Sequence, residues 1–119
     1  MNDILQYENR MWQVAVSGNS KAFLELVSEN AVMICGGCRC TGAEYAELIS
    51  GFGISGYEIT EFETLFSTER IVQVHYIVRT VADSPENADL AGLFHVVSAW
   101  ERGDNGMRLI FNMDQRIYV

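Results

Sequence analysis

Hydrophobic positions change their spacing about halfway along the chain. In the first half, apolar residues recur every three or four positions, as they do on one face of a helix. From Tyr57 onward, apolar and polar residues alternate, and β-branched and aromatic residues dominate, as in the strands of a sheet. The pattern therefore predicts helices first and a sheet after them.

Three short helices are predicted in the first half of the chain. The first helix ends at Gly18, and its apolar face consists of Ile4, Leu5, Met11, Trp12 and Ala15. Asn19 or Ser20 caps the second helix, and Thr41 with Glu44 forms a capping box for the third. Each helix therefore has one side that needs a core to cover it.

Five strands are predicted, one early and four late. The early strand covers residues 31–35 and ends at a Gly-Gly turn, where both residues can adopt positive φ angles. The four long strands run in sequence from Tyr57 to the C-terminus, with turns at 68–69, at 83–89 and at 103–106. The predicted fold class is α+β, with three N-terminal helices packed on a strongly curved, mostly antiparallel sheet.

The turn at residues 103–106 fixes a register that predicts which side chains share the inner face of the sheet. The inner pairs across the last two strands are Trp100–Leu109, Ser98–Phe111, Val96–Met113 and Phe94–Gln115. The preceding strand adds Val72, Val74, Tyr76 and Val78 to this face. This nearly apolar surface is the one that the helices must cover.

The same register predicts an outer face of mixed character. It sets His95 opposite Asp114, the one predicted pairing of a histidine with a carboxylate. Apolar residues also collect there, namely Ile77, Leu93, Val97, Ala99 and Ile110. A solvated face would not gather these residues, so we expect a homodimer that forms through the outer face of the sheet.

Composition narrows the classes of protein that remain. The length of 119 residues and the 49% hydrophobic content predict a single domain over residues 1–119. No signal peptide or membrane span is recognisable, so we expect a cytoplasmic protein with no membrane partner. The net charge of −8 repels phosphate backbones, which makes nucleic acid an unexpected partner.

Three cysteines lie close together at Cys35, Cys38 and Cys40, a cluster that can indicate a metal site or a redox role. A closed zinc site needs four nitrogen or sulfur ligands, and the only histidines, His75 and His95, are far along the chain. The alternative is three reduced thiols beside a hairpin turn. We expect no metal and no cofactor, and the role of the cysteines stays open.

Several segments together resemble a known superfamily. They are Glu8-x-x-x-Trp12, Ser17-Gly18-Asn19, Ala31-Val32-Met33, Thr41-Gly42, Ser98-Ala99-Trp100 and Leu109-Ile110-Phe111. Over almost the whole chain the sequence resembles the nuclear-transport-factor-like superfamily, in particular its SnoaL-like and calmodulin-kinase-association-like small proteins. The resemblance implies a cystatin-like, cone-shaped barrel with an inner pocket, and dimerisation through the outer sheet face.

The resemblance does not by itself select a reaction, because such folds include isomerases, dehydratases, polyketide cyclases and transport factors. The steroid-isomerase branch needs a helix tyrosine and a carboxylate base. The tyrosine position falls on Trp12 in this sequence and the base position falls near Cys35. That particular chemistry is therefore rejected.

Glu8 is the first candidate for a catalytic residue. It lies in the middle of an apolar helix face, one turn after Ile4 and one turn before Trp12. A carboxylate in apolar surroundings has a raised pKa and can transfer protons near neutrality. The alternative is a structural anchor that accepts hydrogen bonds from Trp12, Tyr76 or the backbone. His95 with Asp114 is the second catalytic candidate.

A ligand pocket is predicted where aromatic and polar residues converge on the inner face. Its expected members are Trp12, Tyr76, Ser98, Trp100, Phe111 and Gln115, although core packing explains them equally well. Two functions remain open. One is a small-molecule-binding protein that acts without a cofactor, as an isomerase or lyase, on a small hydrophobic metabolite. The other is a non-catalytic homodimerisation or accessory module of the same fold.

Overall fold

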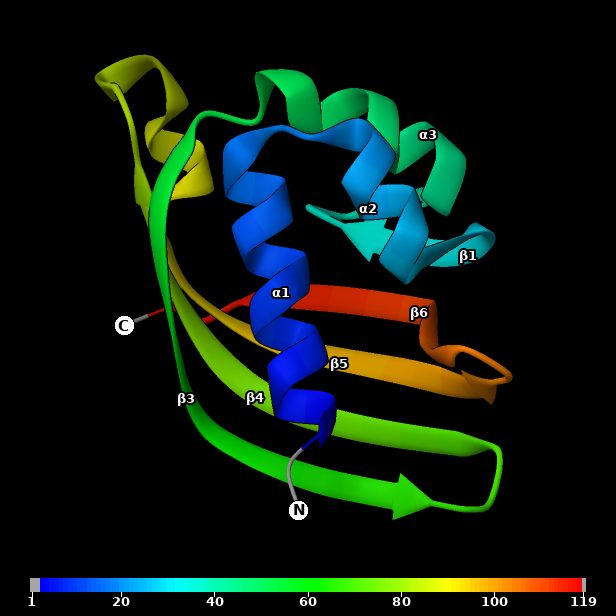
Figure 1. The fold of residues 1–119 in the computed structure, drawn as a ribbon. Coiled ribbons are helices and arrows are strands. Elements are labelled where there is room, and N and C mark those ends of the chain that lie inside the picture. The colour runs from blue at the N-terminus through cyan, green and yellow to red at the C-terminus, as the bar shows by residue number, and fades with distance from the viewer. Residues whose placement is uncertain (1–2, 119) are drawn as a thin grey trace.

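The computed structural model describes residues 3–118, in which helices lie against one side of a bent sheet (Figure 1). The α-helices are α1 (Asp3–Ser17), α2 (Ser20–Leu26) and α3 (Gly42–Leu48), and the 3₁₀ helices are η1 (Ile49–Gly51) and η2 (Pro85–Leu90). The strands are β1 (Val27–Cys35), β2 (Cys38–Thr41), β3 (Ile54–Ser67), β4 (Ile71–Ala82), β5 (Gly92–Gly103) and β6 (Gly106–Arg116).

The six strands form one sheet in the order β2-β1-β6-β5-β4-β3. All neighbouring pairs are antiparallel except β1 and β6, which run parallel. The long strands curve around α1, which lies across their concave side, while α2 and α3 cover β1 and β2 (Figure 1). The predicted α+β class is confirmed, but the sheet is not closed into a barrel, because β2 and β3 remain its two edges.

Local signals in the sequence fix the helix boundaries. Gly18 follows α1 with a φ of 71°, a conformation that glycine adopts without steric cost. The Asn19 side chain accepts a hydrogen bond from the backbone N–H of Ala22 at 3.0 Å, so it is the cap of α2. Thr41 and Glu44 form the predicted capping box of α3, with hydrogen bonds of 2.8 and 3.1 Å.

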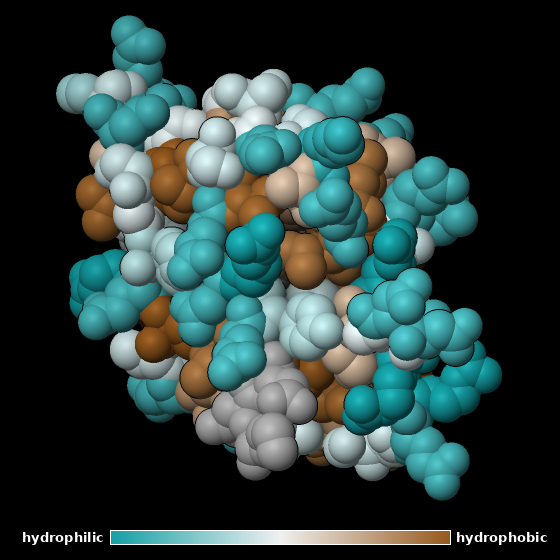
Figure 2. All heavy atoms as spheres, in the orientation of Figure 1, coloured by the Kyte–Doolittle hydropathy of each residue, from teal (hydrophilic) through white to brown (hydrophobic). Residues whose placement is uncertain are grey.

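The core lies between α1 and the inner face of the sheet. The buried strand residues Val72, Val74, Tyr76, Val78, Val96, Trp100 and Leu109 face Met11, Val14 and Ala15 of α1. Polar residues occupy the opposite side of this helix at Gln6, Arg10, Gln13 and Ser17. Figure 2 shows the molecular surface in the orientation of Figure 1, and hydrophilic side chains separate hydrophobic patches on it. No helix within residues 3–118 is long and apolar enough to cross a membrane.

A β-bulge in β6 makes part of the predicted register wrong. Ala99 pairs with Phe111, but Trp100 pairs with Leu109, so Ile110 is an extra residue on β6. Because alternate residues of a strand face opposite sides, one extra residue reverses the faces of all that follow. Asn112 therefore pairs with Ser98 on the inner face, where Phe111 was predicted.

Candidate functional site

Glu8 is a fully buried carboxylate that joins α1 to two strands. Its side chain has no exposed surface. Its Oε1 accepts a hydrogen bond from the Tyr76 hydroxyl of β4 at 2.5 Å, and its Oε2 accepts one from Trp100 Nε1 of β5 at 2.7 Å. Trp12, one helical turn further along α1, donates its Nε1–H to the Tyr76 oxygen at 2.8 Å. Glu8 thus receives hydrogen bonds on both carboxylate oxygens.

A second arm of this polar network runs toward β1. The Asn112 side-chain amide donates to Ser98 Oγ at 2.9 Å, and the Cys35 thiol donates to Asn112 Oδ1 at 3.6 Å. A hydrogen bond from Ser98 also reaches Glu8 and lowers its pKa. Among the residues that the structure describes, no buried side-chain nitrogen or oxygen lacks a hydrogen-bond partner. The inner face therefore carries one continuous and satisfied network from Glu8 to Cys35.

Burial has the largest effect on the pKa values of the ionisable groups in the network. Loss of hydration raises the pKa of Glu8 above its usual value, and the hydrogen bonds from Tyr76, Trp100 and Ser98 oppose this rise. The pKa of Tyr76 also rises well above its usual value, first through burial and then through the charge of Glu8. Glu8 therefore holds its proton more tightly than an exposed glutamate does.

A cavity of about 30 Å³ lies beside the network, between α1 and the sheet. Its walls include the aromatic side chains of Trp12, Tyr45 and Phe52 and the polar side chains of Asn112 and Asp114. The volume is about that of one water molecule. Glu8 does not line it, so Glu8 acts on this space only through Trp12 and, by way of Ser98, through Asn112.

Asp114 is the ionisable group on the cavity wall. Its Oδ1 accepts a hydrogen bond from the backbone N–H of Gly36 at 3.0 Å. Burial raises the pKa of Asp114, and the Gly36 hydrogen bond acts in the opposite direction. Burial, together with the charge of Asp114, also raises the pKa of the neighbouring Cys35 thiol. Asp114 is therefore an acid placed to exchange a proton with a molecule in the cavity.

The predicted site residues divide into two groups. Trp12 lines the cavity, and Tyr76, Ser98 and Trp100 lie on the inner face as fully buried members of the polar network. Phe111 and Gln115 were predicted on that face and this was wrong, because the bulge at Ile110 turns them to the outer face. Asn112 and Asp114 take their places, and an unbroken alternation of residues gives no signal of that exchange.

The predicted pairing of His95 with Asp114 was also wrong. His95 pairs with Gln115 on the outer face, whereas Asp114 lies opposite Val96 on the inner face. His95 instead contacts His75, with 2.8 Å between His95 Nδ1 and His75 Nε2. His75 Nδ1 in turn lies 2.7 Å from the Glu63 carboxylate, across strands β3, β4 and β5.

The register predicted from the sequence places His75 beside His95 on the outer face but does not bring Glu63 to them, because a bulge at Glu61, which has a φ of 54°, sets the register of β3. Within residues 3–118, no group of three or more histidine, cysteine, aspartate or glutamate side chains is arranged to hold a metal ion.

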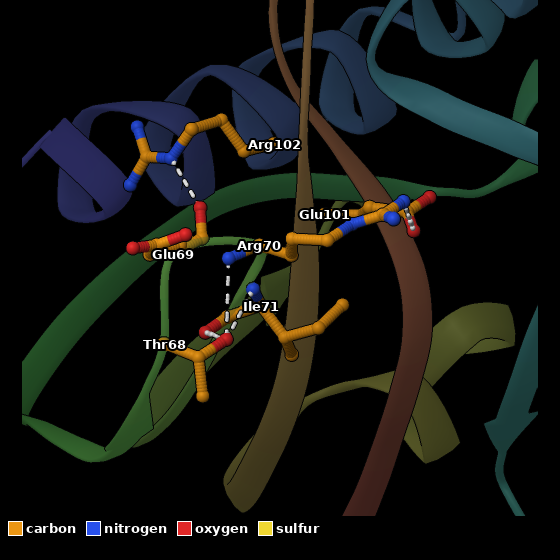
Figure 3. Close-up of polar contacts among 6 residues, drawn as sticks. All are labelled: Thr68, Glu69, Arg70, Ile71, Glu101 and Arg102. Carbon is orange, nitrogen blue, oxygen red and sulfur yellow. Dashed lines mark hydrogen bonds and ion pairs between the residues drawn. The ribbon is translucent and has the colours of Figure 1, made fainter.

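A wider groove of about 530 Å³ lies at the N-terminal end of α1, and it is distinct from the cavity. Its polar wall includes Gln6, Thr64, Ser67 and Arg102. Figure 3 shows how the adjoining turns are held. The Arg102 Nε–H donates to the Glu69 carbonyl at 3.0 Å, and Arg70 forms an exposed ion pair with Glu101 at 3.2 Å. These contacts tie the β3–β4 turn to the end of β5.

The curved sheet, the helix across its concave side and the enclosed polar site define the NTF2-like protein fold, which is also called cystatin-like. Scans of protein-family models and of curated proteins find no match to this sequence. Solved structures do match it, at low sequence identity, and they show the fold alone.

An NTF2-like protein from Cytophaga hutchinsonii superposes with a TM-score of 0.84 at 16% identity, covering 98% of this chain and 100% of that one. An NTF2-like protein of unknown function in nutrient uptake from Rhodospirillum rubrum gives a TM-score of 0.76 at 19% identity, covering 98% and 100%. An NTF2-like protein with a cystatin-like fold from Novosphingobium aromaticivorans gives a TM-score of 0.76 at 15% identity, covering 97% and 80%. The resemblance seen in the sequence is thereby confirmed for the fold.

Proposed function

We propose that this protein binds a small, mostly hydrophobic metabolite in the inner cavity and converts it, without a cofactor, as an isomerase or lyase. The observation that carries the proposal is Asp114, an acid of raised pKa on a wall otherwise formed largely by apolar and aromatic side chains. An apolar site with a few polar groups is typical of small-molecule pockets.

The ligand has to enlarge the cavity, since about 30 Å³ holds no metabolite. Phe52 is the wall that can move. It is half-buried, and it stands between Gly51 and Gly53, of which Gly53 has a φ of 70°. Glycines on both sides let the backbone rotate at low steric cost. In the proposal, Phe52 swings outward and the ligand takes its place against Trp12 and Tyr45.

In the proposed reaction, Asp114 removes a proton from a carbon atom next to a carbonyl group of the ligand. Returning that proton to another carbon gives an isomer, and loss of a leaving group gives an elimination product. Asn112, beside Asp114 on the cavity wall, has a side-chain amide that can orient a polar group of the ligand. Glu8 is a positioning residue in this scheme, because its network sets the orientation of Trp12 and of Asn112.

The proposal is tested by a thermal-shift screen of hydrophobic acids, ketones and aromatic metabolites, followed by product analysis for each ligand that stabilises the protein. The Asp114→Asn variant keeps an acceptor for Gly36, so we expect it to bind the same ligands and to lose turnover. The matched control is Asp89→Asn, an exposed position, which should behave like the wild type. If Asp114→Asn binds the ligand and still turns it over at the wild-type rate, the assignment of Asp114 is refuted.

A second candidate function is a non-catalytic homodimerisation or accessory module. It is favoured by the small cavity and by apolar side chains on the outer face, where Met113 is 37% exposed. Sedimentation equilibrium of the wild type and of Val97→Arg, a change in the middle of that face, tests the dimer. A dimer that Val97→Arg disrupts, together with no stabilising ligand, would favour this function over catalysis.

A further inference from the structure

The three cysteines lie on one side of the β1–β2 hairpin. Cys35 pairs directly with Cys38 across the two strands, and Met33 pairs with Cys40. Residues that pair directly across strands point to the same side, as do residues two apart along one strand. All three thiols are free in the structure. The hairpin therefore gathers three thiols that the proposed function does not use.

The spacing selects one pair among the three. Directly opposite residues in an antiparallel ladder have Cβ atoms about 4.5–5.5 Å apart, whereas diagonal neighbours are about 7–8 Å apart. A disulfide needs about 3.5–4.5 Å between Cβ atoms. The Cβ atoms of Cys35 and Cys38 need to approach each other by only about 1 Å to form a disulfide. Cys35 and Cys40 are diagonal neighbours, so their Cβ atoms would have to approach by several times that distance.

The hairpin can make that small closure. The turn between the two cysteines consists of Gly36 and Gly37, both exposed, with φ angles of 62° and 80°. β2 is only four residues long and forms an edge of the sheet, so no strand on its far side resists a shift.

Exposure gives the two thiols different roles. Cys38 is exposed, so a dissolved oxidant meets it first. Cys35 is half-buried and bonded to Asn112, and burial raises the pKa of its thiol. Reactive cysteines are accessible ones, and a second thiol nearby completes the reaction by forming a disulfide.

We propose that Cys35 and Cys38 form a reversible redox pair, a modification site that peroxides oxidise to a disulfide. The Cys38 thiolate attacks one oxygen of the peroxide, so that an S–O bond forms, the O–O bond breaks and, with hydrogen peroxide, hydroxide leaves. The Cys35 sulfur then attacks the Cys38 sulfur, the S–S bond forms, the S–O bond breaks and water leaves with the thiol proton. A dithiol reductant returns two electrons and two protons and restores both thiols.

Oxidation also reaches the inner face. When the disulfide forms, Cys35 loses its thiol proton and with it the hydrogen bond to Asn112. Asn112 lines the cavity and donates to Ser98, so the oxidised hairpin releases one end of the polar network. This consequence does not depend on the identity of any ligand.

The sequence allows a direct test by peptide mapping. Trypsin cuts after Lys21 and Arg39, so Cys35 and Cys38 share peptide 22–39, while Cys40 begins peptide 40–70. The reduced protein is treated with a small excess of hydrogen peroxide, alkylated with iodoacetamide and digested. Peptide 22–39 should then be unalkylated and lighter by two hydrogen atoms, with Cys40 alkylated, and a dithiol should reverse the change.

Variants separate this pair from the alternatives. Cys40→Ser should form the same intrapeptide disulfide, whereas Cys38→Ser should lose it. A cross-link between peptides 22–39 and 40–70 would overturn the assignment, and so would alkylation of all three cysteines after peroxide. Sulfinic acid at Cys38 with no disulfide would also overturn it, because it would show that Cys35 cannot reach Cys38 in time. The wild-type peptide map decides the proposal even if a variant folds poorly.

Discussion

Replacing Glu8 by alanine removes the acceptor of two buried hydrogen bonds. Trp100 Nε1–H, which can only donate, would lose its partner at 2.7 Å, and the Tyr76 hydroxyl would lose its partner at 2.5 Å. Each buried polar group left without a partner costs about 1–3 kcal/mol. Removing the buried carboxylate recovers part of this loss, so we expect Glu8→Ala to lower the free energy of unfolding by about 3 kcal/mol.

Glu8→Gln is the conservative counterpart of that change. The amide oxygen can accept from Trp100, and the amide nitrogen can donate to the Tyr76 oxygen, whose own proton must then turn toward Ser98. We expect a loss of about 1 kcal/mol, because the contacts persist without their charge-assisted strength.

The pH dependence distinguishes a carboxyl group from an amide at this position. The pKa of Glu8 in the folded protein is raised above its ordinary value of 4.5. A raised pKa means that the folded state binds the proton more tightly than the unfolded state does. The stability that this provides is fully present below pH 4.5. It is lost as the pH rises through the pKa that Glu8 has in the folded protein. The loss cannot exceed about 1.4 kcal/mol per pH unit, and Glu8→Gln should lack it.

Urea unfolding followed by circular dichroism measures both effects. The wild type, Glu8→Ala, Glu8→Gln and the exposed control Glu47→Gln are compared near pH 4.5 and near pH 7.5. If Glu8→Ala unfolds at the same urea concentration as the control, the role of Glu8 as a buried acceptor is refuted. A difference between wild type and Glu8→Gln that is equal at both pH values would refute its raised pKa.

Three further predictions, which use four substitutions, are checked by the same urea unfolding experiment. Trp12→Phe removes the donor 2.8 Å from the Tyr76 oxygen and should cost about 1 kcal/mol; no change would show that this bond contributes nothing. Ser98→Ala and Asn112→Ala, made singly and together, should show a coupling of at least about 0.5 kcal/mol through their 2.9 Å bond, and strict additivity would contradict it. Tyr7→Phe removes the oxygen that accepts from the Met107 N–H at 3.1 Å, and should cost about 1 kcal/mol unless water replaces that acceptor.

The sequence alone predicted the features that depend on neighbours along the chain. Gly18, Asn19 and the Thr41–Glu44 capping box set helix boundaries, because a helix end needs partners within a few residues. The turn at Gly36-Gly37 and the meander of four long strands followed from turn chemistry and from a period of two. The burial of Glu8 was also foreseen, since a carboxylate in an apolar helix face must meet the core.

The tertiary structure alone decided which strand residues face the cavity. The extra residue at Ile110 reverses the faces of Asn112 and Asp114, and no local pattern marks its position. It also decided that Glu8 accepts a hydrogen bond from Trp100, 92 positions away, and it selected Tyr76, 68 positions away, from the donors that the sequence had left open. A bulge forms where a strand must bend over a packed core, and residues so distant in sequence meet only when that core packs. The spacing of nearby residues therefore predicts neither the position of the bulge nor the partners of Glu8.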